Sequence, residues 1–374
     1  MVIGIDIRTF VISQLTGIGI YTWEILNHLF KENTGTQYKL FYNQGFGRQI
    51  KQVQEFKNYP NVSLHYHRWP NKFLNFSLKY FKGPCLDELL GGTDIFWFPN
   101  LNFWQVSHKS KTIITIHDLS FIRLPWAYSP KMRWWHKLID LSEKLKSADK
   151  IIAVSANTKN DLIELYKLPQ DKIEVIYSAV SAEPKANNLI SIKQKYNLPN
   201  KFILFLGTLE PRKNVEGIIQ AFKSLNQIDV DLVIAGGQGW LYKRIYQKAN
   251  QSKLKNRIHF IGYIKPDDRF AFYKMAQALV WPSFYEGFGF PPLEAMSCGC
   301  PVITSANSSL PEVVGNAALL VDPYNINEIS LAINQILTSS QLRQNLINKG
   351  YEQVKKFDWQ TSAKKMAEVF RQIE

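Results

Sequence analysis

Short runs of apolar residues alternate with longer segments of mixed polarity along the whole chain. This pattern is typical of buried parallel strands that are joined by crossover helices. The first series of predicted strands covers residues 2–7, 95–98, 112–116, 150–154 and 173–176. The second series covers residues 202–206, 232–235, 258–260, 278–281, 301–304 and 318–321. We therefore predict an α/β protein with two parallel sheets.

A polar stretch, residues 178–200, separates the two series of strands. A length of 374 residues favours two to three domains, at about 150 residues each. The predicted organisation is an N-terminal domain over residues 1–178, a linker over 179–200 and a C-terminal domain over 201–355, followed by a terminal helix over 356–374. Because α/β domains bind ligands at the carboxyl ends of their strands, we expect the chemistry in a cleft between the two domains.

Composition narrows the class of protein. Hydrophobic residues make up 45% and charged residues 20% of the sequence, which excludes a disordered chain, a coiled coil and a collagen-like repeat. The formal net charge of +14 favours an acidic partner, which could be nucleic acid, anionic lipid or a phosphorylated substrate.

The cysteines and the apolar segments bear on the compartment. Cys85, Cys298 and Cys300 are too few for a disulfide scaffold and fit a reducing cytosol. No apolar stretch is long enough to span a membrane, and Asp6 and Arg8 interrupt the apolar N-terminus, which argues against a secretory leader.

The segment from Trp281 to Val302 is the most informative one. Two prolines suit the first turn of a helix and Gly299 suits its end, so the glycine-rich loop before them predicts a helix N-terminus that can hold a phosphate. Glu286 and Glu294 flank this loop, eight residues apart. Carboxylates beside a phosphate site would repel the anion, so we expect them to accept hydrogen bonds from sugar hydroxyls. The alternative is a pair of ordinary glutamates that complement the helix dipole.

A second cluster follows the predicted strand 202–206. Gly207 and a turn with Pro211 place Arg212 and Lys213 at the start of an amphipathic helix, near the carboxyl end of the strand. Two such cations suit a diphosphate, because charge-assisted hydrogen bonds are about twice as strong as neutral ones. We expect Lys213 to be a surface cation in an open cleft, and the alternative is a solvated basic helix start.

Two weaker motifs lie in the N-terminal half. Gly17 and Gly19 precede a predicted helix, but Thr22 stands where a dinucleotide fingerprint has its third glycine. His117 and Asp118 follow the predicted strand 112–116 at its carboxyl end, which favours a functional histidine over a structural one.

The sequence predicts no metal and no cofactor. Asp229 and Asp231 have the spacing of a metal-dependent sugar-nucleotide site, but they precede their predicted strand, which favours a solvated turn. Cys298 and Cys300 lack a second pair of ligands, and the seven histidines show no zinc spacing.

Residues 39–82 are rich in basic and aromatic side chains. The basic residues are Lys39, Arg48, Lys51, Lys57, Arg68, Lys72, Lys79 and Lys82. The interleaved aromatic residues are Phe41, Tyr42, Phe46, Tyr66, Trp69, Phe73, Phe76, Tyr80 and Phe81. This mixture suits an anionic membrane surface, single-stranded nucleic acid, or core aromatics beneath a solvated basic face. Residues 131–137 have the same character.

With these motifs, the chain resembles the retaining glycosyltransferases of family 4. The segment EGFGFPPLEAM matches the family's pair of glutamates, and GTLEPRKN, HDLSF and the early GIG match its other motifs. The residues of these motifs are similar to those of bacterial mannosyltransferases that build O-antigen or exopolysaccharide. The resemblance implies the GT-B fold, in which two Rossmann-like domains face each other across a cleft and the C-terminal helix, residues 356–374, returns to the N-terminal domain.

The resemblance also implies roles for individual residues. It assigns Arg212 and Lys213 to the donor diphosphate, Glu286 to the transferred hexose and Glu294 to the nucleotide ribose. Further donor-binding residues implied in this way are Gly17, Gly19, Thr208, Tyr263, Ile264, Phe288 and Gly289, and His117 would face the transferred sugar. Thr208 stands where many members carry an arginine, so phosphate neutralisation would depend on Arg212, Lys213 and the helix N-terminus at Pro292.

The resulting hypothesis is a metal-independent hexosyltransferase that transfers mannose from GDP-mannose, with retention, to a lipid-linked or polysaccharide acceptor. The diphosphate would leave first and help to deprotonate the acceptor, so no protein nucleophile is required. One alternative uses a UDP-sugar on the same fold, and a more distant one is a nucleic-acid-binding protein, although we expect no nucleic-acid partner. We expect a cytoplasmic protein at the inner face of the plasma membrane, where Lys72, Lys79 and Lys82 contact anionic lipid near the acceptor.

Overall fold

The computed structural model describes residues 1–11, 17–32, 35–45, 51–180, 188–225 and 229–374. The chain divides into two compact units. Unit 1 comprises Met1–Leu119, Trp134–Ala179 and Asp358–Glu374, and unit 2 comprises Ser120–Arg133 and Val180–Phe357. Each unit is built on one parallel sheet, so the predicted two-sheet α/β architecture is confirmed.

Unit 1 contains a seven-stranded parallel sheet in the order β3-β2-β1-β4-β5-β6-β7. Its strands are β1 (Val2–Asp6), β2 (Gln37–Asn43), β3 (Val62–His67), β4 (Ile95–Phe98), β5 (Lys111–Ile116), β6 (Lys150–Ala153) and β7 (Ile173–Val175). All four residues of β4 are buried, because helices cover both faces of a parallel sheet. The same apolar character made five of these strands visible in the sequence.

The sequence analysis missed β2 and β3, which lie inside the basic and aromatic interval. Polar residues interrupt their apolar pattern, and Lys39 Nζ in β2 donates to the carbonyl oxygens of Leu90 and Gly92 at 2.9 and 3.0 Å. Phe41 and Tyr42 are fully buried in the sheet. The prediction that the whole interval rests on a membrane is therefore wrong for this part, and the alternative of core aromatics is correct there.

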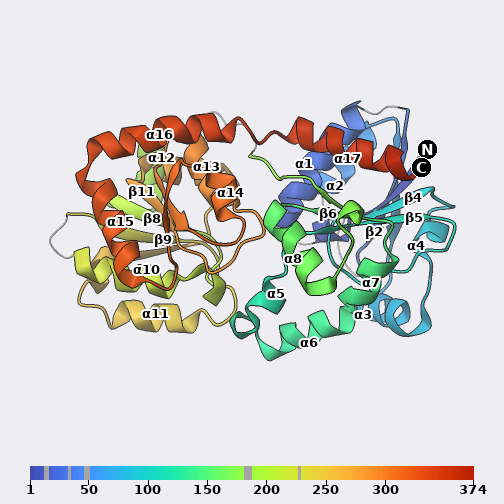
Figure 1. The fold of residues 1–374 in the computed structure, drawn as a ribbon, viewed down its shortest axis with the longest axis horizontal. Helices are drawn as coiled ribbons and strands as arrows, with labels where there is room; N and C mark the ends of the chain where they lie inside the picture. Colours follow the sequence, from blue (N-terminus) through green and yellow to red (C-terminus); the bar gives the residue numbers. More distant parts are fainter. Residues whose placement is uncertain (12–16, 33–34, 46–50, 181–187, 226–228) are drawn as a thin grey trace. The chain divides into compact units, whose positions relative to one another are not determined.

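The helices of unit 1 include one from the far end of the chain. They are α1 (Gly17–Glu32), α2 (Lys51–Glu55), α3 (Asn71–Phe76), α4 (Leu86–Leu89), α7 (Leu141–Ser147), α8 (Ala156–Tyr166) and α17 (Trp359–Ile373), and α6 (Pro130–Ile139) begins in unit 2 and continues into unit 1. Helix α17 lies beside α1 (Figure 1). Trp359 packs edge-on against Tyr21, and Ser362 Oγ donates to the carbonyl of Tyr177 at 2.7 Å. The expected return of the C-terminal helix is confirmed.

Unit 2 contains a six-stranded parallel sheet in the order β10-β9-β8-β11-β12-β13. Its strands are β8 (Phe202–Leu206), β9 (Asp231–Ala235), β10 (Ile258–Gly262), β11 (Ala278–Trp281), β12 (Val302–Ser305) and β13 (Ala318–Val321), all six of which were predicted. Its helices are α5 (Ser120–Arg123), α9 (Leu189–Lys195), α10 (Val215–Phe222), α11 (Lys243–Asn250), α12 (Arg269–Met275), α13 (Phe290–Ser297), α14 (Leu310–Val314), α15 (Ile326–Thr338) and α16 (Ser340–Val354). Figure 1 shows the strands between α12, α13 and α16 on one side and α10 and α11 on the other.

The segment Ser120–Arg133 comes from the first half of the chain but packs within unit 2. Leu124, Ala127 and Tyr128 form a buried cluster with Tyr285. The ring of Tyr128 stacks on Trp240 with centroids 5.6 Å apart, and Trp240 Nε1 donates to the carbonyl of Ala127. This segment therefore supports the loop that carries Tyr285. Within the described ranges, no helix has both the length and the apolar character needed to cross a membrane.

Candidate active site

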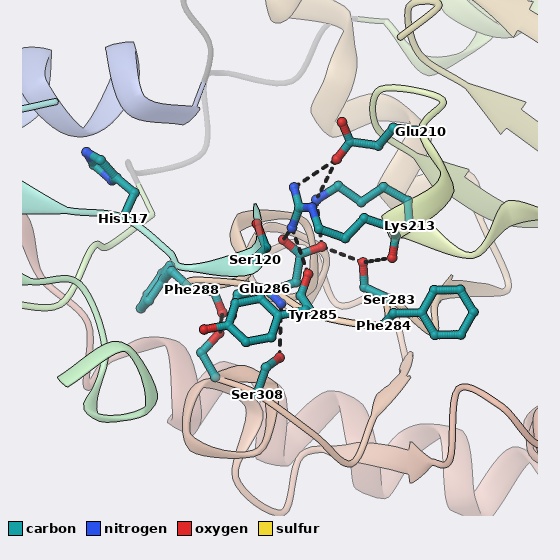
Figure 2. A network of polar contacts seen from close by, with 12 residues as sticks. His117, Ser120, Glu210, Lys213, Ser283, Phe284, Tyr285, Glu286, Phe288 and Ser308 are labelled. Carbon is teal, nitrogen blue, oxygen red and sulfur yellow. Dashed lines mark hydrogen bonds and ion pairs between the residues drawn. The ribbon is translucent and has the colours of Figure 1, made fainter. Parts of the chain in front are cut away.

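Five polar side chains form a connected network where β8 and β11 end (Figure 2). Arg212 Nη1 donates to Glu286 Oε2 at 2.9 Å, and Arg212 Nη2 donates to Glu210 Oε1 at 2.8 Å. Lys213 Nζ and Ser283 Oγ both donate to Glu286 Oε1 at 2.6 Å. We call these five residues the Glu286 network. Two carboxylates and two cations meet in it, so its formal charge is zero.

The local sequence explains how the two cations reach Glu286. A short 3-10 turn, Pro211–Lys213, follows Glu210, and Pro211 fits its first position. Asn214 ends the turn in the left-handed region, with φ 56°, and its side chain donates to the carbonyl of Pro323 at 2.7 Å. This turn presents Arg212 and Lys213 side by side to the loop that follows β11.

A close contact between β8 and β11 fixes the position of Lys213. A Cβ atom on Gly207 would lie 2.5 Å from the ring of Trp281, so this position after β8 accepts no side chain. Trp281 stacks on Phe205 with ring centroids 5.0 Å apart, and Lys213 Nζ lies 4.8 Å from the centre of the Trp281 ring. The aromatic face thus stabilises the ammonium group by a cation–π contact.

Burial distinguishes these cations from an ordinary basic surface. The side chains of Arg212 and Lys213 are 11% and 12% exposed, and those of Glu210 and Glu286 are 5% and 8% exposed. The alternative of a solvated basic helix start is therefore wrong. The sequence-based view of Lys213 as a surface cation is wrong for the same reason.

The network keeps Glu286 ionised. Burial alone would raise the pKa of Glu286, but the charges of Lys213 and Arg212 and hydrogen bonds from Lys213 and Ser283 outweigh it and lower the pKa to about 2. Burial lowers the pKa of Lys213, and the neighbouring charge of Arg212 lowers it further, while Glu286 and Glu210 oppose both effects. Glu286 therefore acts as an acceptor of hydrogen bonds at neutral pH.

The segment after β12 holds the Glu286 loop in place. Ser308 Oγ accepts from the backbone N–H of Glu286 at 3.0 Å, and Ser309 Oγ donates to the carbonyls of Glu286 and Phe288 at 2.9 and 2.8 Å. Asn307 donates to the carbonyl of Phe284 at 3.0 Å. These bonds satisfy backbone groups of a buried loop and fix the direction of Glu286.

The predicted helix N-terminus is confirmed as α13 (Phe290–Ser297). Gly289 precedes it with φ 118°, a conformation that other residues rarely adopt, and prolines occupy the first turn. Gly299 ends the turn after the helix with φ 68°. Phe288 is buried against Phe290 and Phe357, and its assignment to the donor stays a prediction.

Glu294 lies in α13 beyond its first turn and has different partners from Glu286. Its Oε1 pairs with Arg269 at 3.0 Å, and its Oε2 accepts from the hydroxyl of Tyr273 at 2.8 Å. The dipole alternative is wrong for this pair, because both glutamates are buried and paired with cations. The assignment of Glu294 to a ribose stays a prediction.

The other predicted donor residues of unit 2 lie at the same edge of its sheet. Thr208 follows β8, is exposed and lies against Gly239. Tyr263 and Ile264 follow β10, and Tyr263 is 48% exposed whereas Ile264 is buried. Because carboxyl ends of parallel strands share one edge, these residues and the Glu286 network belong to one face of unit 2.

The predicted residues of unit 1 are placed separately. His117 follows β5, and its Nε2 lies 2.8 Å from the carbonyl oxygen of Pro99, while its ring packs edge-on against Tyr21. Burial lowers the pKa of His117, although the Pro99 hydrogen bond and Asp118 oppose this shift. Gly17 and Gly19 were predicted to precede a helix, but both lie in the first turn of α1. The preceding residues, 12–16, lie outside the described part of the chain.

Several residues of the site were missed by the sequence analysis. Glu210 directly precedes the Pro-Arg-Lys turn and Ser283 stands three residues before Glu286, so an acidic and a hydroxyl neighbour were visible signals. Ser308 and Ser309 begin the segment SSLPEVVG, which also resembles the bacterial mannosyltransferases, but the sequence suggested no role for them because they meet the loop only after β12 folds beside β11.

The solvated turn expected for Asp229 and Asp231 is correct for Asp229 but wrong for Asp231, which lies in a strand and is paired with Arg257 and His259. Asp231 is the first residue of β9 and contacts His259 at 2.6 Å, and the side chain of Asp229 is 98% exposed. Within the described ranges, no three His, Cys, Asp or Glu residues form a group that could hold a metal ion.

The basic and aromatic interval contributes a surface from α3 and the π-helical turn η3 (Ser77–Phe81). Its aromatic residues are largely exposed: Phe73 66%, Phe76 52%, Tyr80 60% and Phe81 74%. Lys72 and Lys82 are exposed and Lys79 is half-buried among them. We call these seven residues the α3–η3 surface. In α6, Trp134 is also 63% exposed. Phe46, Arg48 and the side chain of Lys51 lie outside the described residues.

Comparison with known proteins identifies the family. The family model described as Glycosyltransferase Family 4 matches residues 15–183, and the model described as Glycosyl transferases group 1 matches residues 188–353. O-antigen chain mannosyltransferase B of Escherichia coli is 33% identical over 358 residues, which cover 92% of this chain and 93% of that protein. The serotype-specific mannosyltransferase WbdA of Escherichia coli is 32% identical over 273 residues, which cover 70% of this chain and 34% of WbdA.

A solved structure supports the fold. Sucrose-phosphate synthase from Thermosynechococcus elongatus superposes with a TM-score of 0.75 and 21% identity, over 100% of this chain and 99% of that chain. At this identity the likeness establishes the GT-B architecture of two Rossmann-like units. Together with the family models and the close relative, it shows that the chain belongs to glycosyltransferase family 4 and is a hexosyltransferase.

Proposed function

We propose that this glycosyltransferase transfers mannose from GDP-mannose, with retention of configuration, to a lipid-linked or polysaccharide acceptor in cell-surface glycan synthesis. The mannosyltransferase names of its relatives, at 33% and 32% identity, support the sugar and the pathway class. The observation that carries the chemistry is Glu286, a buried carboxylate that Arg212 and Lys213 hold ionised beside a helix N-terminus.

Arg212 and Lys213 stabilise the departing diphosphate in this proposal. The ammonium of Lys213 has three N–H donors, and the hydrogen bond to Glu286 uses one of them. The dipole of α13 adds a partial positive charge at its N-terminus, although the prolines at positions 291 and 292 have no N–H to donate. Because negative charge grows on the diphosphate as its bond to the sugar breaks, these groups bind the transition state more strongly than the ground state.

Glu286 accepts a hydrogen bond from a hydroxyl of the transferred hexose through the second lone pair of its Oε2, and thereby orients the sugar. The bond between the anomeric carbon and the phosphate oxygen breaks, and the acceptor oxygen bonds to the same face of the sugar. The acceptor's proton passes to an oxygen of the leaving diphosphate. No protein nucleophile takes part, so the enzyme acts by positioning and by charge stabilisation.

His117 contributes a neutral imidazole. The carbonyl oxygen of Pro99 can only accept, so His117 Nε2 carries the hydrogen and Nδ1 is left as an acceptor. A lowered pKa keeps this form at neutral pH. We assign Nδ1 of His117 to a hydroxyl of the transferred sugar, and we assign Gly17 and Gly19 in the first turn of α1 to the donor phosphate.

The nucleotide occupies the remaining predicted residues. Glu294 binds the ribose through the second lone pairs of its carboxylate oxygens, since Arg269 and Tyr273 use one on each. Tyr263 and Ile264 lie near the base, and the backbones of Phe288 and Gly289 contact the hexose and phosphates.

A donor panel tests the proposal. The purified chain is incubated with a mannose oligosaccharide and GDP-mannose, UDP-glucose, UDP-galactose or UDP-N-acetylglucosamine, and the anomeric configuration of the product is determined by NMR. We expect transfer from GDP-mannose with retention. Transfer from a UDP-sugar alone would establish the alternative donor class, and an inverted product would overturn the mechanism.

We further propose that transfer needs no metal, because Arg212 and Lys213 supply the positive charge at the diphosphate. Activity should be unchanged after treatment with EDTA. Loss of activity that magnesium or manganese restores would contradict this proposal.

The α3–η3 surface is proposed to bind the inner face of the plasma membrane. Exposed phenylalanine and tyrosine rings beside lysines match the chemistry of the lipid headgroup region, where each lysine contributes about 1 kcal/mol of attraction to anionic lipid. Attachment there would bring the enzyme to a lipid-linked acceptor.

A further inference from the structure

A pocket of unit 2 lies outside the residues assigned to the donor. Its volume is about 380 Å³, which is within the range of about 300–1,000 Å³ that small-molecule sites occupy. It is lined by Trp126, Glu216, Gln220, Arg244, Phe284 and Tyr324, among others. We call it the Trp126 pocket.

Three aromatic rings form one wall of the Trp126 pocket. Trp126 packs edge-on against Phe284 with centroids 5.3 Å apart, and Phe284 contacts Tyr324 with centroids 4.8 Å apart. Trp126 is nevertheless 52% exposed and Tyr324 is 63% exposed. Large rings that are held in contact yet left open to solvent provide a rigid surface for a ligand at small entropic cost.

Polar side chains face the same pocket. Glu216 and Gln220 are four residues apart on α10, and therefore lie on one face of that helix, while Arg244 comes from α11. Among the described residues, these three side chains have no hydrogen-bond or ion-pair partner. A carboxylate, an amide and a guanidinium group are thus available to a ligand with both donors and acceptors.

The charge of the pocket argues against a phosphate. Glu210 also lines it, but its carboxylate is paired with Arg212. The remaining charges, Glu216 and Arg244, cancel. A neutral ligand with many hydroxyls satisfies the polar groups, and the apolar C–H face of a sugar ring stacks on aromatic rings, whose faces carry partial negative charge.

The pocket adjoins the Glu286 network and shares Glu210 with it, but it contains none of the residues assigned to the donor. The backbone N–H of Phe284 donates to the carbonyl of Arg212 at 2.8 Å, and Phe284 stands two residues before Glu286. Figure 2 shows the ring of Phe284 pointing away from the carboxylate of Glu286. A ligand in the pocket therefore contacts the side of this loop that carries the Phe284 ring, and not the side that carries the Glu286 carboxylate.

We infer that the Trp126 pocket binds a sugar unit of the acceptor glycan, away from the unit that receives the new sugar. This inference rests on the proposed function only for the identity of the glycan. This site binds a growing glycan in addition to the site of transfer. Longer acceptors, which reach both sites, therefore bind more tightly than short ones.

Binding is tested first without turnover. Mannose oligosaccharides of two to six units are added to the full-length protein, and saturation-transfer NMR measures their binding to the parent, to Trp126→Ala and to Tyr324→Ala. We expect the dissociation constant to rise about tenfold in each variant. Tyr351→Ala, which removes another exposed ring of unit 2, is the matched control and should bind as the parent does. Equal binding by all four proteins would overturn the inference.

Kinetics then assign the pocket to the acceptor. With GDP-mannose as donor, we expect the parent's acceptor KM to fall with acceptor length, and both pocket variants to lose this dependence. A rise in donor KM instead would place a donor group in the pocket and refute the inference. If the parent binds oligosaccharides but transfers nothing from GDP-mannose, the proposed donor fails and the pocket still stands.

Discussion

The two basic regions of this chain, the Glu286 network and the α3–η3 surface, use the same kinds of side chain in opposite surroundings. Arg212 and Lys213 are almost completely buried and each contacts a carboxylate within 3 Å. Lys72 and Lys82 are exposed beside exposed aromatic rings. Buried charges must be paired, because removing one partner leaves the other uncompensated in a poorly solvated place. Exposed charges carry no such penalty.

This difference predicts that stability and activity are linked in one region and independent in the other. The groups that we propose to stabilise the leaving diphosphate also hold the loops after β8 and β11 together. A substitution in the Glu286 network should therefore change both the rate and the free energy of unfolding. A substitution on the α3–η3 surface should change neither.

The largest effect is expected for Lys213→Ala. Loss of one charge at the diphosphate should lower kcat by about 10² to 10³-fold, and loss of one of the two cations paired with Glu286 should cost up to about 3 kcal/mol of unfolding free energy, because Arg212 stays paired with it. Lys243→Ala, at an exposed lysine of α11, is the control and should change stability by less than about 0.5 kcal/mol. Urea unfolding and initial rates measure the two quantities. An unaltered stability for Lys213→Ala would show that the network contributes no more than a surface pair.

Substitutions of the two glutamates should have smaller effects, which differ between kcat and the donor KM. Glu286→Gln and Glu294→Gln each remove a buried, paired carboxylate, so both should destabilise the protein. Only Glu286 is assigned to the reacting sugar, so its variant should lower kcat by about 10²-fold, whereas Glu294→Gln should mainly raise donor KM, by about tenfold. Equal changes of kcat in the two variants would contradict the division of roles.

The sequence predicted the sheet of unit 2 more completely than that of unit 1, for a physical reason. Strands β8 and β11 are covered on both faces, so they are continuous apolar runs. Strand β2 carries Lys39, whose ammonium donates to backbone carbonyls that follow α4, and β3 is an edge strand without a fully buried residue. Polar residues in such strands conceal them from a search for apolar runs.

The sequence predicted which residues belong to the candidate site, but not how they pair with one another. The residue types at positions 212, 213, 286 and 294 predicted a sugar-nucleotide site through motif and spacing, and this stays a prediction. The ion pair between Arg212 and Glu286 joins residues 74 positions apart, and their contact depends on β8 lying beside β11. For that reason the sequence suggested exposed cations where the structure has buried ones.

The acid stability of the protein should report the state of Glu286. Its pKa is lowered from 4.5 to about 2 in the folded chain, so its contribution to stability is complete above about pH 4.5 and is lost as the pH falls towards 2. Urea unfolding of the parent and of Glu286→Gln between pH 2 and pH 7 measures this contribution. The difference between the two proteins should be constant near neutral pH and narrow below about pH 4.5. A constant difference down to pH 2 would refute the ionised, paired carboxylate.

The smallest effect on catalysis is expected at the α3–η3 surface. Replacing Lys72, Lys79 and Lys82 together by Glu should release the protein from anionic vesicles, because three attractive charges become repulsive. Transfer to a short soluble acceptor should stay the same, since these three side chains take no part in the Glu286 network. Flotation with anionic and neutral vesicles measures binding, and the parent's attachment should weaken with added salt, as the screening length falls below about 10 Å above 0.1 M. Phe73→Ser with Phe81→Ser is the companion variant, and it should weaken attachment at every salt concentration because it removes the apolar contribution. Equal binding of the parent to both kinds of vesicle, or to neither, would make this region an ordinary solvated face, and the contrast between the two basic regions would then reduce to burial alone.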